Sequence, residues 1–212
     1  MGSMGRGLAN ATHGPDEPVT MINLSDAMVW CNALSELLGR EPVYTNDPEG
    51  KLVYRQAIQF RIEMFRGKDY PIYSFRTNYP KGAVVDTGAY VPVYQRAAAN
   101  GFRLPLPAEW QVADQPDRRL PPLEGNWLAG NSQGKTHPVG TKPPNAVGLC
   151  DMGGNVIELC WGSTSAFTNG APRRLGDYFF REPGKRHSNL DTPEHSSTVR
   201  AHCGFRVVTR QP

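Results

Sequence analysis

The chain has 212 residues, enough to bury a sizeable core, and a formal net charge of only +3 at pH 7. Such a weak positive charge gives no argument for nucleic-acid binding. No apolar run approaches the roughly 18 residues that a membrane-spanning helix needs. The 22 glycines and 19 prolines predict a loop-rich domain. A helical bundle, a coiled coil, a membrane-spanning protein and a disordered tail are therefore disfavoured.

The chain contains four cysteines: Cys31, Cys150, Cys160 and Cys203. They are too few for a disulfide scaffold, and none forms the CxxC pair of a zinc ribbon or a thioredoxin-like motif. We expect reduced thiols that are mostly buried. We recognise no signal peptide in the first residues, so the cellular compartment stays open. The oligomeric state is equally open.

The predicted elements begin with a glycine-rich, polar arm over residues 1–17, which we expect to be flexible or to lie on the surface. Residues 18–212 are predicted to form one domain. Its clearest helix follows Ser25 and Asp26, taken as the N-cap, and ends before Gly39. The apolar positions that define this helix recur at helical spacing: Ala27, Trp30, Cys31, Leu34 and Leu38.

The later predicted elements are short. Alternation of apolar and polar residues over 58–64 predicts a half-buried strand. Pro107 is typical of the first residue of a helix, and residues 115–146 are predicted to be almost entirely loop. A buried strand is predicted over 156–161 (VIELCW), and a last strand over 204–209 (GFRVVT). Together these elements predict one compact α+β domain with two helices, several short strands and long ordered loops.

Four stretches of the chain resemble, in order, the formylglycine-generating-enzyme (sulfatase-modifying-factor) domain family. They are PVTMINLSDAMVWCNALSELLGREPVYT (18–45), NGFRLPLPAEWQVA (100–113), THPVGTKPPNAVGLCDMGGNVIELCW (136–161) and CGFRVV (203–208). The GLCDMGGNVIELCW portion is the most specific of them. The resemblance implies a C-type-lectin-like fold with two helices, a small mixed sheet and much irregular loop.

The chain departs from the family's pattern at two places. Family members usually carry a glycine-rich PGGxFxMG-like segment well upstream of the PVT stretch, whereas only residues 1–17 precede Pro18. The family's enzymes also have two active-site cysteines, five residues apart, which bind copper and oxidise a substrate cysteine. The corresponding region here, residues 173–194, contains no cysteine, so we expect no copper and no thiolate chemistry.

The chain is more similar to the family's non-catalytic binding members, which include variable proteins diversified by retroelements. In those members the segment before the final GFRVV is a display surface, and residues 177–202, the display segment, hold that position here. The segment mixes aromatic, basic and hydrogen-bonding side chains, as recognition surfaces do. Candidate binding residues are Tyr178, Phe180, Arg181, His187, Asn189, Asp191, His195, Ser197, Arg200 and His202. The expected ligand is a protein or a surface glycan.

A solvated loop is the alternative interpretation of the display segment. In that case one or two of its aromatic side chains are tucked into the core. Phe179 or Phe180 is expected to pack there rather than to contact a ligand, because adjacent residues on an extended segment face opposite ways. His187, His195 and His202 could be considered as metal ligands, but their spacings fit no standard motif.

The resemblance also implies a calcium site. Asp151, Gly154, Val156 and Glu158 match the family's ligands position by position, with two side-chain and two backbone oxygens, a set that suits Ca²⁺. The alternative is that Asp151 and Glu158 only cap turns and pair with a local arginine. The family's other calcium position falls within residues 126–133, which contain no carboxylate and are not expected to bind the ion.

Several residues of the matching motifs are expected to be structural. Trp30, Trp110 and Trp161 match core positions of the family, and Arg103 and Arg206 are expected to form structural hydrogen bonds. A cysteine nucleophile is disfavoured because no base is positioned beside one in the sequence. The leading hypothesis is thus a non-catalytic binding protein. A divergent metal-dependent oxidase acting on a protein cysteine and an inert structural module remain the alternatives.

Overall fold

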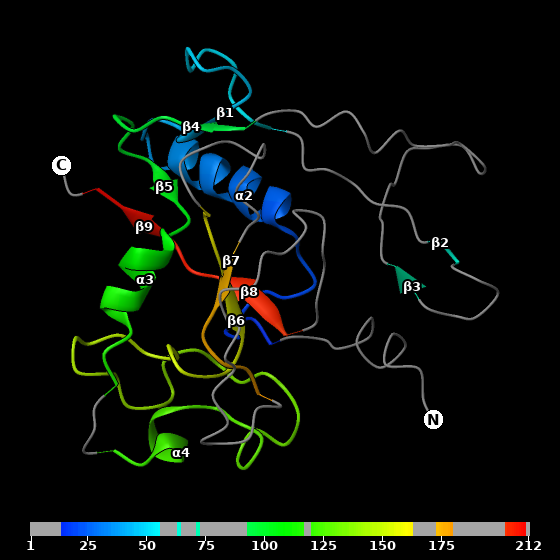
Figure 1. Ribbon diagram of the computed structural model, residues 1–212, viewed down its shortest axis with the longest axis vertical. Helices are drawn as coiled ribbons and strands as arrows, with labels where there is room; N and C mark the ends of the chain where they lie inside the picture. Colours follow the sequence, from blue (N-terminus) through cyan, green and yellow to red (C-terminus); the bar gives the residue numbers. More distant parts are fainter. Residues whose placement is uncertain are drawn as a thin grey trace.

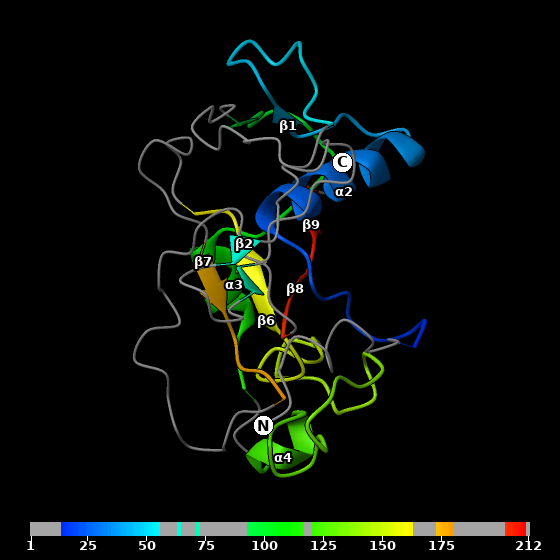
Figure 2. The same cartoon turned by 90° about the vertical axis from the view of Figure 1, so that its right-hand side faces the viewer.

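The structure is a computed structural model that describes residues 14–55, 63–64, 71–72, 93–116, 120–162, 173–179 and 202–210. Long irregular loops join short strands and three helices within these residues, which confirms the α+β class. The helices are α2 (Leu24–Leu37), α3 (Pro107–Ala113) and α4 (Pro122–Gly125). Both views place α2 towards one end of the molecule and α4 at the other, with a small sheet between them (Figures 1 and 2). None of the helices in the described part of the chain has the length and apolarity to span a bilayer.

The ends of α2 are fixed by side-chain and glycine capping. Asn23 is the N-cap: its Oδ1 accepts a hydrogen bond from Asp26 N at 2.9 Å, and Asp26 Oδ2 accepts one from Asn23 N at 3.0 Å. The predicted cap at Ser25 and Asp26 was therefore placed too late, because both residues lie inside the helix. Gly39 adopts φ 66° just beyond the helix, as the predicted stop requires.

A three-stranded sheet forms the centre of the domain. The central strand is β6 (Ile157–Cys160), with β7 (Arg173–Leu175) antiparallel on one side and β8 (Cys203–Phe205) parallel on the other. Every residue of β6 is buried, because the sheet is covered on both faces. This strand confirms the prediction over residues 156–161.

Alternation along β6 separates two hydrophobic clusters. Ile157 and Leu159 face the larger cluster, which includes buried residues of α2 such as Met28. Cys160 faces the smaller cluster, which contains Trp110 of α3. Trp110 and Trp161 are buried, as predicted for core tryptophans.

The remaining strands form three separate antiparallel pairs. These are β1 (Tyr44–Thr45) with β4 (Tyr94–Gln95), β2 (Glu63–Met64) with β3 (Pro71–Ile72), and β5 (Phe102–Arg103) with β9 (Val208–Thr209). Only 63–64 of the strand predicted over 58–64 lie within the described residues. The single strand predicted over 204–209 is wrong: it divides into β8 and β9, which belong to different sheets.

The burial of α2 departs from the helical pattern in the sequence. Trp30 and Leu38, expected in the core, are about half exposed, whereas Ala27 and Cys31 are fully buried. The buried side of the helix mixes apolar residues with three polar ones, namely Ser25, Asn32 and Ser35. Periodicity identifies the helix correctly but does not reveal that Asn32 and Ser35 face inwards, where both form hydrogen bonds.

Asn32 explains why a polar residue belongs in that interface. Its Nδ2 donates to the carbonyl oxygens of Tyr44 and Tyr54 at 2.8 and 2.9 Å, and its Oδ1 accepts from the N–H groups of Val43 and Tyr44 at 3.0 Å each. One buried amide therefore uses all of its hydrogen-bonding capacity to attach α2 to the chain around β1.

Replacing Asn32 by alanine leaves the N–H groups of Val43 and Tyr44 buried without this acceptor. We predict that Asn32→Ala lowers the free energy of unfolding by about 3 kcal/mol or more. Glu36→Ala on the exposed side of the same helix removes only a surface ion pair with Arg55 and should cost under about 1 kcal/mol. Urea unfolding of both variants measures the difference, and equal losses would contradict this role for Asn32.

Candidate ligand-binding surface

The two ends of the display segment meet on the central sheet. The segment follows β7 and leads into β8, and both strands are hydrogen-bonded to β6. Tyr178 near its start and His202 at its end stack with ring centroids 4.3 Å apart and planes inclined by 24°. Tyr178 also packs against the larger hydrophobic cluster, so this pair joins the segment to the core. Of the predicted binding residues, the structure brings these two together.

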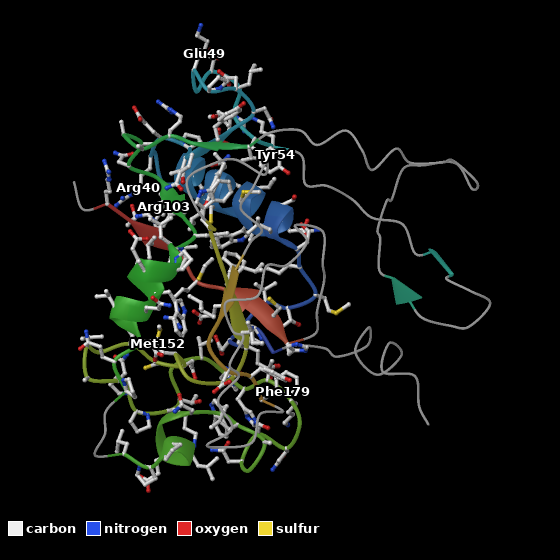
Figure 3. All side chains as sticks on the ribbon, viewed as in Figure 1. Arg40, Glu49, Tyr54, Arg103, Met152 and Phe179 are labelled. Carbon is white, nitrogen blue, oxygen red and sulfur yellow. The ribbon has the colours of Figure 1, made fainter. Side chains whose placement is uncertain are left out.

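Phe179 anchors the start of the segment. Its side chain is 3% exposed, its carbonyl oxygen accepts a hydrogen bond from Ser132 Oγ at 2.6 Å, and its N–H donates to Asn155 O at 3.2 Å. This confirms that a phenylalanine of the segment packs in the core. Figure 3 shows it towards the end of the molecule opposite α2.

Neither Ser132 nor Asn155 is identified as an anchor by the sequence. Gly154-Asn155 is a turn signal, and Asn155 indeed adopts φ 68°. Its fully buried amide also joins a second loop, accepting from His137 N at 3.0 Å and donating to His137 O at 2.9 Å. The turn residue could be found from sequence, but its distant partners could not.

The other candidate binding residues lie outside the described part of the chain. They are Phe180, Arg181, His187, Asn189, Asp191, His195, Ser197 and Arg200. Their role in binding stays a prediction. The structure describes the two ends of the display segment: β7, β8, the Tyr178–His202 stack and the buried Phe179.

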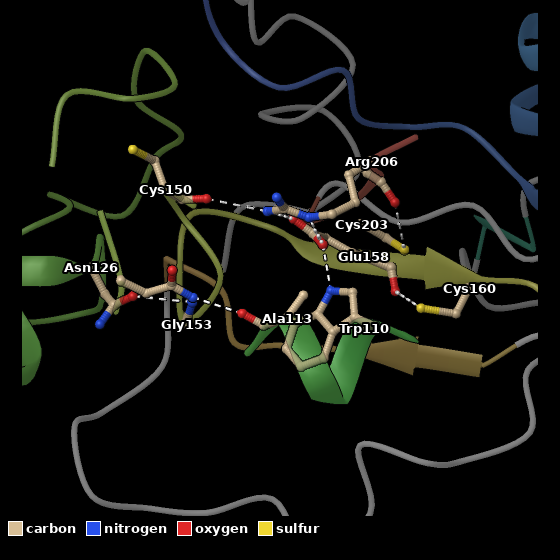
Figure 4. A network of polar contacts seen from close by, with 11 residues as sticks. Trp110, Ala113, Asn126, Cys150, Gly153, Glu158, Cys160, Cys203 and Arg206 are labelled. Atoms are coloured by element: carbon tan, nitrogen blue, oxygen red, sulfur yellow. Dashed lines mark hydrogen bonds and ion pairs between the residues drawn. The ribbon is translucent and has the colours of Figure 1, made fainter. Parts of the chain in front are cut away.

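A buried ion pair lies beneath this base. Arg206 donates to Glu158 through Nε and Nη2, both at 2.5 Å, and Trp110 Nε1 donates to Glu158 Oε2 at 2.6 Å. Arg206 Nη2 also reaches the carbonyl oxygen of Cys150 at 3.3 Å. Figure 4 shows these groups converging on β6 from α3 and from the chain beyond β8.

Arg206 stays charged in this ion pair. Burial opposes the charged form of Arg206, but its hydrogen bonds with Glu158 and the attraction between their charges outweigh this, so the pKa of Arg206 is raised. Arg206 is therefore structural, as predicted. Arg103 is as well: its guanidinium binds the Glu109 carboxylate of α3 at 2.6 and 2.7 Å.

The two predicted side-chain ligands of calcium, Asp151 and Glu158, differ in whether a carboxylate oxygen lacks a hydrogen bond. Asp151 is 8% exposed; its Oδ2 accepts from Gly140 N at 2.8 Å, while its buried Oδ1 has no hydrogen-bond partner. Burial raises the pKa of Asp151 despite the hydrogen bond from Gly140. Glu158, in contrast, has both oxygens occupied by Arg206 and Trp110.

The fit to calcium is thus partial. An unpartnered buried carboxylate oxygen suits the ion, but coordination by Glu158 would require it to exchange Arg206 for the metal. Among the described residues, no three histidine, cysteine, aspartate or glutamate side chains converge as metal ligands. Calcium binding through Asp151, Gly154, Val156 and Glu158 stays a prediction, and the thermal midpoint with and without added calcium tests it.

The four cysteine thiols are all free of disulfides. Three are buried: Cys31, Cys160 and Cys203. Desolvation raises the pKa of Cys31 to about 12 and that of Cys160 even further. These two thiols are therefore protonated at neutral pH and are poor nucleophiles.

Comparison with known proteins identifies the family to which this architecture corresponds. The sequence model of the "Sulfatase-modifying factor enzyme 1-like domain" matches residues 2–211. A curated relative is the chaperone protein LppX of Paenibacillus barcinonensis, 28% identical over 174 residues. The alignment covers 70% of this chain and 52% of LppX, so the chain spans about half the length of the curated relative it matches.

Two solved structures share the fold. The crystal structure of CarF has a TM-score of 0.63 and 22% sequence identity, over 95% of this chain and 70% of CarF. Treponema denticola variable protein 1 has a TM-score of 0.61 and 22% identity, over 95% of this chain and 74% of that protein. These likenesses confirm the expected C-type-lectin-like fold of the formylglycine-generating-enzyme type and the predicted similarity to a variable protein.

Removing one partner of the buried ion pair should be far more damaging than removing one partner of the partly exposed pair. We predict that Glu158→Gln lowers the free energy of unfolding by about 3 kcal/mol or more, because this nearly buried carboxylate accepts hydrogen bonds from both Arg206 and Trp110, whereas the Glu109 side chain is 40% exposed. Glu109→Gln opposite Arg103 should cost about 1 kcal/mol. Chemical denaturation of both variants measures the two losses of unfolding free energy. Losses of similar size would show that the Glu158 pair does not stabilise the domain more than the Glu109 pair does.

Proposed function

Because this chain belongs to the sulfatase-modifying factor enzyme 1-like domain family, we propose that it is a non-catalytic binding protein that recognises its ligand through the display segment, residues 177–202. The observation that carries the proposal is the stack of Tyr178 on His202. The stack holds the two ends of the segment together against the core.

A fixed base has a direct energetic consequence for recognition. Ordering a loop on binding costs free energy, and attachment at both ends reduces the number of conformations that the loop must give up. Here both attachment points belong to strands of one sheet, and Phe179 adds a buried anchor. The tyrosine, arginine and histidine side chains of the segment supply contact area and hydrogen bonds.

The relatives favour a protein as the ligand. LppX is named a chaperone, and the Treponema protein is named a variable protein. The first name favours binding to another polypeptide, and the second favours a scaffold that carries an exchangeable surface. We therefore propose a protein ligand first and a surface glycan second. Diversification by a retroelement is a further proposal: a near-copy of the codons for residues 173–208, differing mainly at adenines, would support it.

The binding face can be tested with the full chain on a peptide library and a glycan array. We predict that Arg181→Ala/His187→Ala/His195→Ala weakens binding at least about tenfold, because these side chains supply charge and hydrogen bonds to the ligand. The matched control is Lys51→Ala/Arg55→Ala/Arg210→Ala, which removes three basic residues elsewhere. Equal affinities of the two triple variants, measured by titration with the selected probe, would contradict the proposal.

An oxidase acting on a protein cysteine is the second candidate, favoured by the enzyme in the family's name. Neither Cys31 nor Cys160 supports it, because burial keeps both thiols protonated. We predict that a cysteine-containing sulfatase-type peptide keeps its sulfur after incubation with the protein, copper and oxygen, followed by reduction of any disulfide that copper and oxygen form without an enzyme. Mass spectrometry measures this, and a loss of sulfur with gain of oxygen at that cysteine would establish the oxidase instead.

A further inference from the structure

A carboxylate and an indole are neighbours near the start of α2. Asp26 and Trp30 are four positions apart, so their side chains lie on the same side of the helix. Trp30 is 48% exposed, and its ring meets Phe205 edge to face with the centroids 5.3 Å apart. Part of the indole therefore stays accessible to a ligand.

These two side chains line a groove whose walls are mostly apolar. Its volume is about 390 Å³, which lies in the range of sites that hold small ligands. The lining is formed by Val19, Ile22, Asp26, Trp30, Phe205, Arg206 and Val207. The groove thus lies between the start of α2 and the chain at the end of β8.

The two charged residues of the lining differ in how their charges are compensated. Arg206 is paired with Glu158 through Nε and Nη2 (Figure 4). Asp26, in contrast, forms an ion pair with no basic side chain in the part of the chain that the structure describes. Its Oδ2 accepts a hydrogen bond from the backbone N–H of Asn23 at 3.0 Å. The groove therefore carries one uncompensated negative charge.

The Asp26 carboxylate is held in place without a ligand. The reciprocal hydrogen bonds of the N-cap, between Asn23 and Asp26, fix its position at the groove. Burial raises the pKa of Asp26, because its charge is partly removed from water. A cation bound beside it would favour the charged carboxylate. A fixed, partly desolvated anion next to an exposed indole is therefore suited to an organic cation.

We propose that the groove binds the side chain of a lysine from a partner protein. The ammonium group lies between the Asp26 carboxylate and the Trp30 ring, and the four-carbon stem packs against apolar walls such as Val19 and Ile22. Lysine fits better than arginine, because one Asp26 oxygen is already engaged by Asn23 and a guanidinium is best matched by two carboxylate oxygens.

This site is separate from the binding face proposed above. It uses no residue of the display segment, although Phe205 is the last residue of β8, the strand that follows that segment. The groove is therefore a second point of contact for a protein ligand, and its binding can be measured independently of the first.

The probe is the peptide acetyl-Leu-Lys-Leu-amide, titrated into the full chain and followed by the indole N–H signals in NMR spectra. The Trp30 signal, identified by its loss in Trp30→Phe, should shift with a dissociation constant of about 0.1–1 mM. The same peptide with Nε-acetyl-lysine keeps the stem but lacks the charge, and should bind at least about fivefold more weakly. No shift with the lysine peptide overturns the proposal. Equal affinities for the two peptides also overturn it and indicate a purely apolar occupant.

Two carboxylate-to-amide variants locate the charge that binds the peptide. Asp26→Asn keeps an oxygen for the Asn23 N–H but removes the charge, and should weaken binding of the lysine peptide at least about fivefold. Glu124→Gln is the matched control, because Glu124 is an exposed residue in the first turn of another helix, α4. It should bind as the wild type does. Equal affinities of these two variants contradict the proposed site.

The triple variant Arg181→Ala/His187→Ala/His195→Ala distinguishes this site from the display segment. It should bind the lysine peptide with the affinity of the wild type, even where it loses the ligand of the display segment. Loss of lysine-peptide binding in this variant would place the lysine on the display segment and overturn the proposal.

Discussion

The rest of the domain depends on the buried pair between Glu158 and Arg206. Glu158 lies on the central strand, so its charge must be compensated inside the protein. Arg206 meets it from the chain beyond β8, and Trp110 meets it from α3. Arg206 lies between β8, which ends at Phe205, and β9, which pairs with β5. A single polar contact thus joins a helix, the central sheet and the last strands.

The same contact lies next to the strand that follows the proposed display segment. The chain enters the display segment from β7 and leaves it into β8, the strand that Arg206 follows. The Tyr178–His202 stack closes the two ends, and Asn155 and Ser132 hold Phe179 from the neighbouring loops. In binding proteins, loops commonly carry recognition while the scaffold fixes their ends, which is the role that we propose for this segment.

Local sequence signals predicted the elements that depend on local chemistry. The helices beginning near residues 24 and 107 and the strand over 157–160 follow from spacing, Pro107 and an apolar run. The failures involve distant partners. The family resemblance placed Trp30 in the core, where it does not lie. The helical pattern does not specify which side of α2 is covered, whereas Asn32 attaches one side through hydrogen bonds to residues 43–54.

The sequence predicted where the candidate site lies and which types of side chain it contains, but not which residues contact one another. A resemblance located the display segment and the possible calcium ligands, and composition indicated a recognition surface. Nothing local pairs Tyr178 with His202, or identifies Arg206, 48 positions from Glu158, as the arginine that occupies this carboxylate. Such contacts arise from the sheet topology, because β6 and β8 are neighbours in space and far apart in sequence.

The central claim is that recognition resides in the display segment while the scaffold only supports it. The first experiment is to select, from a library of this chain randomised at Arg181, His187, Asn189 and His195, variants that bind a protein which the parent chain does not bind. The affinity of the selected variants for that protein is then measured. We predict that the selected variants are folded, bind with dissociation constants of about 1 µM or below, and unfold at temperatures close to that of the parent. A library that yields only unfolded chains, or folded chains without binding, would contradict it.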